Sequence, residues 1–367
     1  MKIVWFSEVR WDYHVLTRKH HIISELAKRH EVLYIEPYTL GQGRPFASRK
    51  QGRISVLTLP TLRPSPFRFM NRLIKTRLAW LYYAALYPVV RIMLGNAARG
   101  SVLICSSVYS IPMVNWFAGP RYWDYNDDPE QFAPLPQWAV ASLHRYLERA
   151  DGIFASSRAF EKKLRGMTEA PVYYVPNGLH VTDFQGQPSR ERIGVCYLGA
   201  ILDWSFDFNL MKCLTERLPP DSIHIYGPVG RTVQEQFDEF VAECSVQYQG
   251  VLEYQDVPEV LSSYKVGIVP LRDNPELRRV ASVKVLMYLA AGLMVVSRPM
   301  DEYEDFSPSI RMEVEIEAFT ESVLEYLASP VEDKALAEKL VRLDWKHVVS
   351  EMEGIIASQD ESLLAKR

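Results

Sequence analysis

Short runs of apolar residues alternate along the chain with segments in which hydrophobic positions recur at helical spacing. An apolar run at 2–6 is followed by an amphipathic helical pattern at 17–29 and a second apolar run at 31–36. Such runs predict buried β-strands, and the periodic segments predict helices. Further strands are predicted at 101–107, 121–126, 151–157, 172–178, 193–200, 222–228, 245–251, 265–271 and 293–297. The alternation favours an α/β fold with parallel sheets and crossover helices.

A polar, turn-rich stretch at 176–192 interrupts this alternation, and we interpret it as a linker. With 367 residues the chain is long enough for two domains. We therefore predict two Rossmann-like doubly wound domains, at 1–180 and 190–340. A final amphipathic pattern predicts a C-terminal helical segment at 341–367.

Charge is unevenly distributed, although the formal net charge is only -3. Between Glu36 and Asp124 every charged residue is Lys or Arg, and the acidic residues gather in the second half. This asymmetry indicates that the first half meets an anionic partner, either a membrane surface or phosphates. Nucleic acid is not expected as a partner, because the sequence shows no nucleic-acid recognition module.

The segment 62–94 interleaves arginines with Phe, Trp and Tyr. Its most apolar part, 78–94, is short for a membrane span and contains Pro88 and Arg91. Basic-aromatic amphipathic helices lie in the bilayer interface, so we expect 62–94 to contact the inner-leaflet membrane surface. The alternative is an ordinary surface helix whose arginines extend along its apolar side chains.

The cysteines are scattered and show neither metal nor redox spacing: Cys105, Cys196, Cys213 and Cys244. The N-terminus has no signal-peptide pattern. We expect a cytoplasmic protein, peripheral on the cytoplasmic face of the inner membrane, with no metal site and no cofactor.

A lysine stands in the first turn of the helix predicted to follow Ser282, in the stretch SVKVLMYLAAGLMVVS. Ser282 is a good N-cap residue, because its hydroxyl can accept a backbone N–H of the first turn. The helix dipole disfavours Lys284 at this end unless an anion such as a phosphate is bound there. Lys284, Met287 and Tyr288 share one helix face and would meet the same ligand. The alternative is a surface lysine on a core helix.

Several predicted strands of the second half end in Gly-rich or polar turns. In parallel sheets ligands bind beyond the carboxyl ends of the strands, and glycines there allow close approach or tight turns. Turn formation alone remains the alternative for each glycine. The candidates for this edge, with arginines that could surround a diphosphate, are Gly199, Gly227, Arg272, Arg278 and Arg279.

Carboxylates follow two predicted strands of the first half. Asp124, Asp127 and Asp128 close the strand at 121–126, and a carboxylate near an acceptor hydroxyl can remove its proton. Helix capping is the alternative for Asp127 and Asp128. The loop after the first strand adds Glu8, Asp12 and His14 as acid–base candidates, and Arg18 and His21 as contacts to a substrate phosphate.

The order of these motifs resembles two-domain bacterial glycosyltransferases of the GT-B type, in particular xanthan-type glucuronosyltransferases and teichuronic-acid-type enzymes. The second half is similar to their nucleotide-sugar domain in YLGAI, IYGPV, YQGVLEY and SVKVLMYLAAG. The first half is similar to their acceptor domain in YWDYNDD and VPNGLHVTDF. The resemblance implies two domains that face a cleft and a final helix that packs back on the first domain.

The resemblance also assigns residues. A basic residue at Lys284 binds the donor diphosphate, the turn at 250–252 lines the base and ribose, and Asn177 matches a turn at the cleft. Together with the candidates found above from strand ends and helix spacing, this gives the expected donor-binding residues, Gly199, Gly227, Val251, Leu252, Arg272, Arg279, Ser282, Val283, Lys284, Met287 and Tyr288.

Two departures bear on the mechanism. Retaining members of the largest related family carry two glutamates where this chain has Arg279 and Met287. The Ser-x-Lys pattern followed by a tyrosine is similar to the xanthan-type family, which uses an aspartate base and inverts the anomeric carbon. The resemblance therefore favours an inverting mechanism with Asp127 or Asp128 as base, and Asp12 as a further candidate.

We accordingly expect a glycosyltransferase that moves glucuronate or another hexose from a UDP-sugar to a lipid-linked saccharide or polysaccharide acceptor. Two alternatives remain open. One is a nucleotide-sugar 2-epimerase on the same fold. The other is a non-catalytic GT-B binding subunit, which the missing glutamates suggest.

Overall fold

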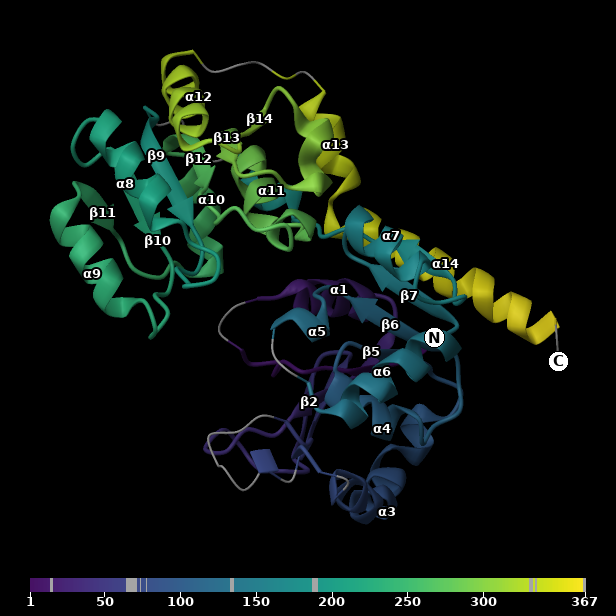
Figure 1. The fold of residues 1–367 in the computed structure, drawn as a ribbon. Helices are drawn as coiled ribbons and strands as arrows, with labels where there is room; N and C mark the ends of the chain where they lie inside the picture. The colour runs from purple at the N-terminus through teal and green to yellow at the C-terminus, as the bar shows by residue number, and fades with distance from the viewer. Residues whose placement is uncertain are drawn as a thin grey trace. The chain divides into compact units, whose positions relative to one another are not determined.

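The computed structural model describes all residues except 14–15, 64–70, 73, 77, 133–134, 187–190, 330–332, 334 and 366–367, and the side chains of 131–132 and 360–365. The chain forms two compact units, which Figure 1 colours from purple at the N-terminus to yellow at the C-terminus. Unit 1 comprises Met1–Ser156, Phe160–Val175 and Val349–Arg367. Unit 2 comprises Ser157–Ala159 and Pro176–Val348.

Unit 1 is built on an eight-stranded sheet. In spatial order the strands are β3 (Ser48–Gln51), β4 (Ile54–Leu59), β2 (Glu31–Pro37), β1 (Lys2–Phe6), β5 (Val102–Cys105), β6 (Arg121–Tyr125), β7 (Gly152–Ala155) and β8 (Val172–Tyr174). All neighbours pair in parallel except β3, which is antiparallel to β4. The inner strands are apolar because helices cover the sheet, so their side chains are buried on both faces.

The helices that unit 1 contains wholly or in part are α1 (Arg18–Ala27), α3 (Leu78–Ala98), α4 (Ile111–Val114), α5 (Pro129–Phe132), α6 (Gln137–Arg149), α7 (Arg158–Arg165) and α14 (Trp345–Ala365). From Val349 onward α14 belongs to unit 1. There Met352 and Ile356 are buried, and Glu353 pairs with Arg29 at 2.5 Å.

Unit 2 is built on a six-stranded, wholly parallel sheet. In spatial order the strands are β11 (Val246–Tyr248), β10 (Ile223–Tyr226), β9 (Ile193–Leu198), β12 (Tyr264–Val269), β13 (Met294–Ser297) and β14 (Ile310–Met312). Its helices include α8 (Phe208–Arg217), α9 (Gln234–Glu243), α10 (Val257–Leu261), α11 (Val283–Ala290), α12 (Ile316–Ala328) and α13 (Leu336–Arg342).

One close contact fixes α11 on the sheet of unit 2. The ring of Tyr288 lies so near Gly267 of β12 that a Cβ added there would be 2.5 Å from the ring carbon Cγ. The buried hydroxyl of Tyr288 accepts the backbone N–H of Leu198 at 2.6 Å, where β9 ends. One side chain therefore positions both α11 and the loop that follows β9.

The predicted fold class is confirmed, since the structure contains two α/β units with parallel sheets. The alternation did not predict β3, whose side chains are all exposed and polar, as suits an edge strand. It also missed β4, although its side chains are mostly buried, and the three-residue β14. Of the segment 62–94, α3 accounts for Leu78 onward, whereas 64–70, 73 and 77 lie outside the described residues.

We predict that Gly267→Ala lowers the free energy of unfolding by about 1–3 kcal/mol, because the methyl group would push the Tyr288 ring off the sheet. Thermal and denaturant unfolding measure the effect. Gly95→Ala, on α3 with open space around its Cα, is the control and should stabilise the protein by about 1 kcal/mol. Equal stability of the Gly267 variant and the wild type would contradict this account of how α11 is held.

Candidate functional site

The start of α11 lies among the carboxyl ends of the strands of unit 2. Ser282 occupies the N-cap position, but its hydroxyl makes no capping hydrogen bond, so the expected side-chain cap is wrong. Its backbone carbonyl instead accepts the Tyr303 hydroxyl at 2.8 Å and the Val285 N–H at 3.1 Å. The backbone at Ser282 is extended, as is usual for an N-cap residue, so the serine hydroxyl is left for other contacts.

Lys284 is a cation without a carboxylate. Its Nζ lies 4.8 Å from the centroid of the Tyr197 ring and 3.5 Å from the Tyr197 hydroxyl. Among the described residues no carboxylate lies within 4.0 Å of this nitrogen. Burial lowers the pKa of Lys284 from 10.5 to about 8. An anion bound here would restore the charged form, because a nearby opposite charge stabilises it.

Two glycines surround this lysine closely. A side chain at Gly199, where φ is +152°, would collide with the Lys284 ammonium group. A side chain at Gly227 would collide with the carbonyl of Gly199. The loops after β9 and β10 therefore approach each other with no side chain between them. This tight backbone packing accounts for both glycines without any ligand.

The arginines near α11 differ in their partners. Arg278 pairs with Asp273 at 3.1 Å, and Arg279 pairs with Glu276 at 2.9 Å, so both are neutralised within their own loop. Arg272 donates to a backbone carbonyl, that of Phe206, at 3.3 Å.

Arg298, which follows β13, was not predicted from the sequence. It is buried, and only one of its terminal nitrogens has a carboxylate partner, Asp207 at 3.3 Å. Among the residues that the structure describes, its buried Nε and Nη1 have no hydrogen-bond partner. Burial identifies it as a second cation available to an anionic ligand, which no spacing in the sequence indicated.

The remaining predicted donor residues lie at the same edge of unit 2 or in its loops. Val251 is 57% exposed and Leu252 is partly buried in the loop after β11. Asn177 donates from its side-chain amide to the carbonyl of Ala281 at 2.9 Å, one residue before the N-cap of α11. Met287 lies at the margin of the core and not within it.

In unit 1, a buried lysine gathers several carboxylates at the carboxyl ends of β1 and β6. Lys19 of α1 is only 3% exposed and forms an ion pair with Glu8. Burial alone would lower its pKa, but Glu8, Asp124 and Asp127 outweigh that effect and raise it. No local pattern singles out Lys19, since only the fold brings these carboxylates to it.

The structure distinguishes Asp127 from Asp128. The Asp128 carboxylate is fully buried, pairs with Lys163 and accepts the Glu130 N–H at 3.2 Å at the start of α5. Asp127 is exposed, and within the described part of the chain its carboxylate accepts the neighbouring Asn126 amide at 2.8 Å. Desolvation by the surrounding protein raises the pKa of Asp127, and Lys19 opposes that shift.

The other predicted residues of unit 1 are placed as follows. Asp12 accepts two hydrogen bonds from Arg10, each 2.8 Å long, and these lower its pKa. Arg18 is buried between Asp124, at 3.1 Å, and the carbonyl of Val175, at 2.7 Å. His21 is also buried, and His14 lies outside the described residues.

A pocket of about 1020 Å³ opens beside these groups within unit 1. Glu8 and Asp12 line it together with three arginines, Arg10, Arg49 and Arg63. Two of these arginines already pair with carboxylates, Arg10 with Asp12 at 2.8 Å and Arg49 with Glu36 at 2.7 Å. The pocket can therefore take a polar ligand, without a clear preference for negative charge.

We predict that Lys284→Met raises the free energy of unfolding by about 1–3 kcal/mol at pH 7. The folded protein holds this lysine at a pKa of about 8, below the unfolded value, so the charged form destabilises the fold below pH 8. As pH rises from 8 toward 10.5 the unfolded state alone retains the proton, so the advantage of methionine should disappear. Denaturant unfolding at several pH values measures this.

Lys265→Met, at an exposed position on β12, serves as the control for this measurement. Its effect should not change between pH 7 and pH 10. If the Lys284 variant behaves in the same way, the lysine is not desolvated in the free protein.

Three comparisons bear on identity. A family model described as glycosyl transferase-like matches residues 209–352. TuaH of Bacillus subtilis (strain 168), whose name assigns it to teichuronic acid biosynthesis as a glycosyltransferase, is 24% identical over 310 residues, which span 76% of either chain.

Solved structures share the fold over the full length. Sucrose-phosphate synthase from Thermosynechococcus elongatus aligns with a TM-score of 0.72 and 14% identity, over 100% of this chain and 99% of the other. Anabaena Alr3699/HepE in complex with UDP aligns with a TM-score of 0.68 and 14% identity, over 98% and 100%. With the two parallel α/β units, these full-length alignments show that the chain has the GT-B fold, and its sequence is similar to the glycosyl transferase-like family model and to the glycosyltransferase TuaH.

Proposed function

We propose that the protein transfers a hexose, glucuronate or another, from a UDP-sugar to a lipid-linked saccharide or polysaccharide acceptor, with inversion at the anomeric carbon. The observation that carries the proposal is Lys284, a desolvated cation without a carboxylate at the N-terminus of α11. A helix N-terminus with an adjacent lysine favours a bound diphosphate. The complex of Alr3699/HepE with UDP supports a uridine nucleotide as donor.

The proposed reaction is a single displacement. The acceptor hydroxyl gives its proton to Asp127 while its oxygen attacks the anomeric carbon. The bond from that carbon to the diphosphate oxygen breaks, and its electron pair leaves with UDP. Lys284, together with Arg298 after β13, stabilises the negative charge that develops on the diphosphate, without a metal or cofactor.

Asp127 suits the base better than the other aspartates do. It is accessible, and its raised pKa makes its carboxylate a better proton acceptor than an ordinary aspartate. Asp128 is engaged by Lys163 and Asp12 by Arg10, so their carboxylates are already committed.

The polar pocket of unit 1, lined by arginines and by the carboxylates of Glu8 and Asp12, supports a saccharide as acceptor. The role that TuaH's name gives it in a cell-wall polymer supports a saccharide acceptor. A lipid-linked acceptor would place the enzyme on the cytoplasmic face of the membrane, with 62–94 as the contacting segment. Within the described residues α3 has the length and apolar composition to cross a membrane, which alone is weak support.

We predict that Asp127→Asn lowers the transfer rate about 10²–10⁴-fold, because the amide cannot accept the acceptor's proton. UDP release measures transfer, with UDP-glucuronate or UDP-glucose as donor and lipid-linked saccharides extracted from bacterial membranes as acceptor. The acid limb of the wild-type pH profile should lie above the ordinary aspartate value of about 4.

Asp12→Asn should retain most of the activity, while Asp128→Asn should mainly lower the unfolding temperature, because it leaves Lys163 without its partner. If Asp127→Asn remains fully active and Glu8→Gln does not, Glu8 is the base and the assignment is wrong. Reactions without acceptor control for hydrolysis or epimerisation of the donor.

We predict that UDP binds more weakly as pH rises above 8, by up to about tenfold per pH unit, because Lys284 must be protonated to bind it. Isothermal titration between pH 7 and pH 10 measures the affinity. Lys284→Arg keeps its charge over this range, so its affinity should stay constant. A wild-type affinity independent of pH would exclude Lys284 from the diphosphate site.

A further inference from the structure

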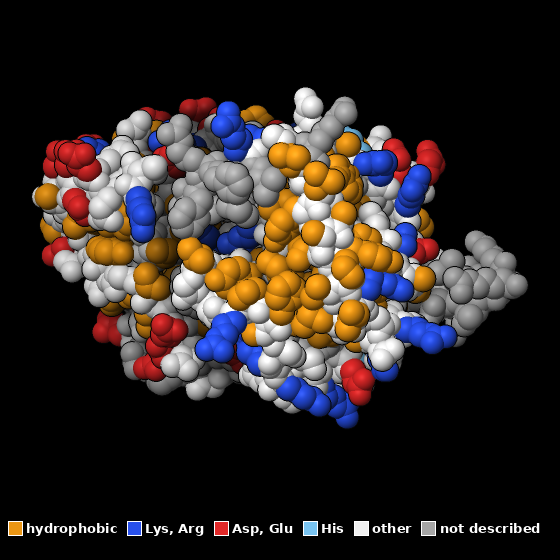
Figure 2. Space-filling model, turned by 90° about the horizontal axis from the view of Figure 1, so that it is seen from below, with side chains coloured by type: hydrophobic (Ala, Val, Ile, Leu, Met, Phe, Trp, Pro, Cys, Tyr) orange, Lys and Arg blue, Asp and Glu red, His pale blue; other side chains and the backbone are white. Residues whose placement is uncertain are grey.

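Helix α3 presents a continuous apolar face to solvent. Residues spaced on one side of the helix are exposed, including Leu81 at 66% and Ile92 at 84%. The full set of large apolar side chains exposed on α3 is Leu78, Trp80, Leu81, Tyr87, Val89, Ile92 and Met93. Viewed from the side on which α3 lies in Figure 1, these side chains form a broad patch bordered by Lys and Arg (Figure 2). An apolar patch of this kind marks an interaction surface.

The opposite side of α3 is built into the core of unit 1. Tyr83, Val90 and Leu94 are buried there, and the Tyr83 hydroxyl donates to the carbonyl of Tyr109 at 2.5 Å. Arg91 donates to the carbonyl of Trp116 at 3.0 Å. To cross a bilayer the helix would have to leave this core, so the folded unit can only lay it along a surface.

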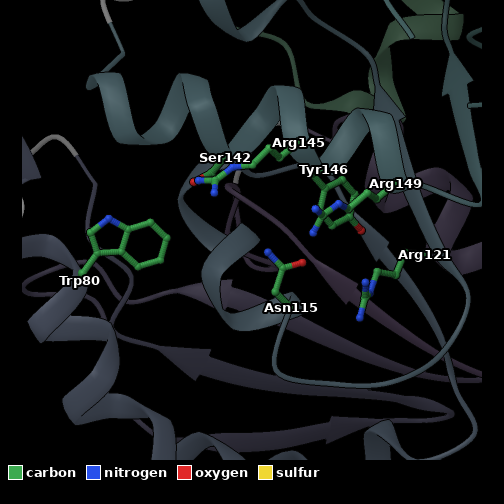
Figure 3. Close-up of a pocket in the computed structure, with 7 residues that line it drawn as sticks. All are labelled: Trp80, Asn115, Arg121, Ser142, Arg145, Tyr146 and Arg149. Atoms are coloured by element: carbon green, nitrogen blue, oxygen red, sulfur yellow. The ribbon is translucent and has the colours of Figure 1, made fainter. Parts of the chain in front are cut away.

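A pocket of about 270 Å³ adjoins α3 through Trp80. Arg145 and Arg149 enter it from α6, Arg121 from the start of β6, and Asn115 from the end of α4 (Figure 3). Its charged lining residues are all arginines. It lies among elements at the opposite end of β6 from Asp127, so it is separate from the proposed catalytic groups.

The cations of this pocket are not neutralised by the protein. In the part of the chain that the structure describes, no carboxylate lies within 4.0 Å of the side chains of Arg121, Arg145 or Arg149. Arg145 donates only from Nε, to the carbonyl of Ala141 at 3.0 Å. Arg121 donates from Nη2 to the carbonyl of Phe117 at 3.0 Å, and among the described residues its buried Nε has no hydrogen-bond partner. Planar guanidinium groups with free N–H pairs match the oxygens of a phosphate.

We propose that this arginine pocket binds the phosphate of an anionic phospholipid headgroup while the apolar face of α3 enters the acyl region of the same bilayer. The proposal rests on, and deepens, the membrane contact in the proposed function. Apolar insertion and attraction to anionic lipid act together in interfacial helices, and a 21-residue helix gives about 31 Å of contact along the surface. A second phosphate source, free in solution, would use the same guanidinium chemistry but not α3.

Flotation of the full chain with vesicles tests the proposal. Wild type should bind vesicles of mixed phosphatidylglycerol and phosphatidylcholine and should not bind vesicles of phosphatidylcholine alone. The double variant Arg145→Gln, Arg149→Gln should bind the mixed vesicles about 25-fold more weakly, since each arginine near an anionic surface contributes about fivefold. Ile92→Ser should also weaken binding, because it places a polar group in the apolar face.

The matched control is Arg217→Gln with Arg342→Gln, which removes two exposed arginines of unit 2 and should leave vesicle binding unchanged. An equal loss of vesicle binding in this control would show that charge attracts the vesicles without a specific site, and it would overturn the proposed pocket. The variant Arg145→Lys, Arg149→Lys keeps the charge but loses the paired N–H geometry. It should recover only part of the affinity, and full recovery would also overturn the site.

Two further outcomes would reject the lipid assignment. Inorganic phosphate, compared with chloride at equal ionic strength, could raise the unfolding temperature of wild type while vesicles fail to bind, which would assign the pocket to free phosphate. Alternatively, the chain could be a dimer in sedimentation that Ile92→Ser converts to a monomer, which would assign α3 to a second copy. Vesicle binding does not require sugar transfer. The membrane proposal can therefore fail while the proposed enzyme activity is confirmed, and the activity can fail while vesicle binding is confirmed.

Discussion

The packing of Tyr288 against Gly267 is the contact on which the candidate donor site depends. Because Gly267 has no side chain, the tyrosine ring can lie directly on β12, and its hydroxyl reaches the backbone N–H of Leu198. This sets the height of α11 above the sheet, and thereby the position of Lys284 beside the loop at Gly199. Any residue other than glycine at position 267 would place its Cβ against the Tyr288 ring and shift α11. The site is thus positioned from beneath, by core packing, while its own first turn lacks a side-chain cap.

The two units surround their desolvated lysines with different groups. In unit 2, Lys284 is desolvated and has an aromatic ring in place of a carboxylate, so burial lowers its pKa and the fold bears an unfavourable charge. In unit 1, Lys19 is surrounded by carboxylates that raise its pKa despite burial. An unpaired buried charge is costly unless a ligand supplies the counterion. The first arrangement is therefore suited to an anion that comes and goes, and the second to holding carboxylates in place.

The outer face of unit 1 shows a third arrangement, in which charge and apolar surface lie side by side. Arginines without carboxylate partners line a pocket next to a helix whose solvent side is apolar. Neither feature alone would indicate a bilayer, since exposed apolar residues and surface arginines are both common. Their contiguity, together with a stretch of chain between Glu36 and Asp124 that has no acidic residue, is what gives the surface its amphipathic character.

The sequence by itself determined the alternation of strands and helices, the α/β class and the lysine at the start of α11, because these follow from local periodicity. It did not determine β3, a polar edge strand with no hydrophobic period, or the absent serine cap. Only the tertiary structure separated Asp127 from Asp128, since the difference is the distant Lys163 that neutralises one of them. Only the tertiary structure places Lys19 beside Glu8 and leaves Arg298 with Asp207 as its carboxylate partner among the described residues. Only the tertiary structure brings α3 next to the arginines of α6. These outcomes depend on residues far apart in the chain, whose encounter is set by sheet order and burial, and no local pattern encodes that order.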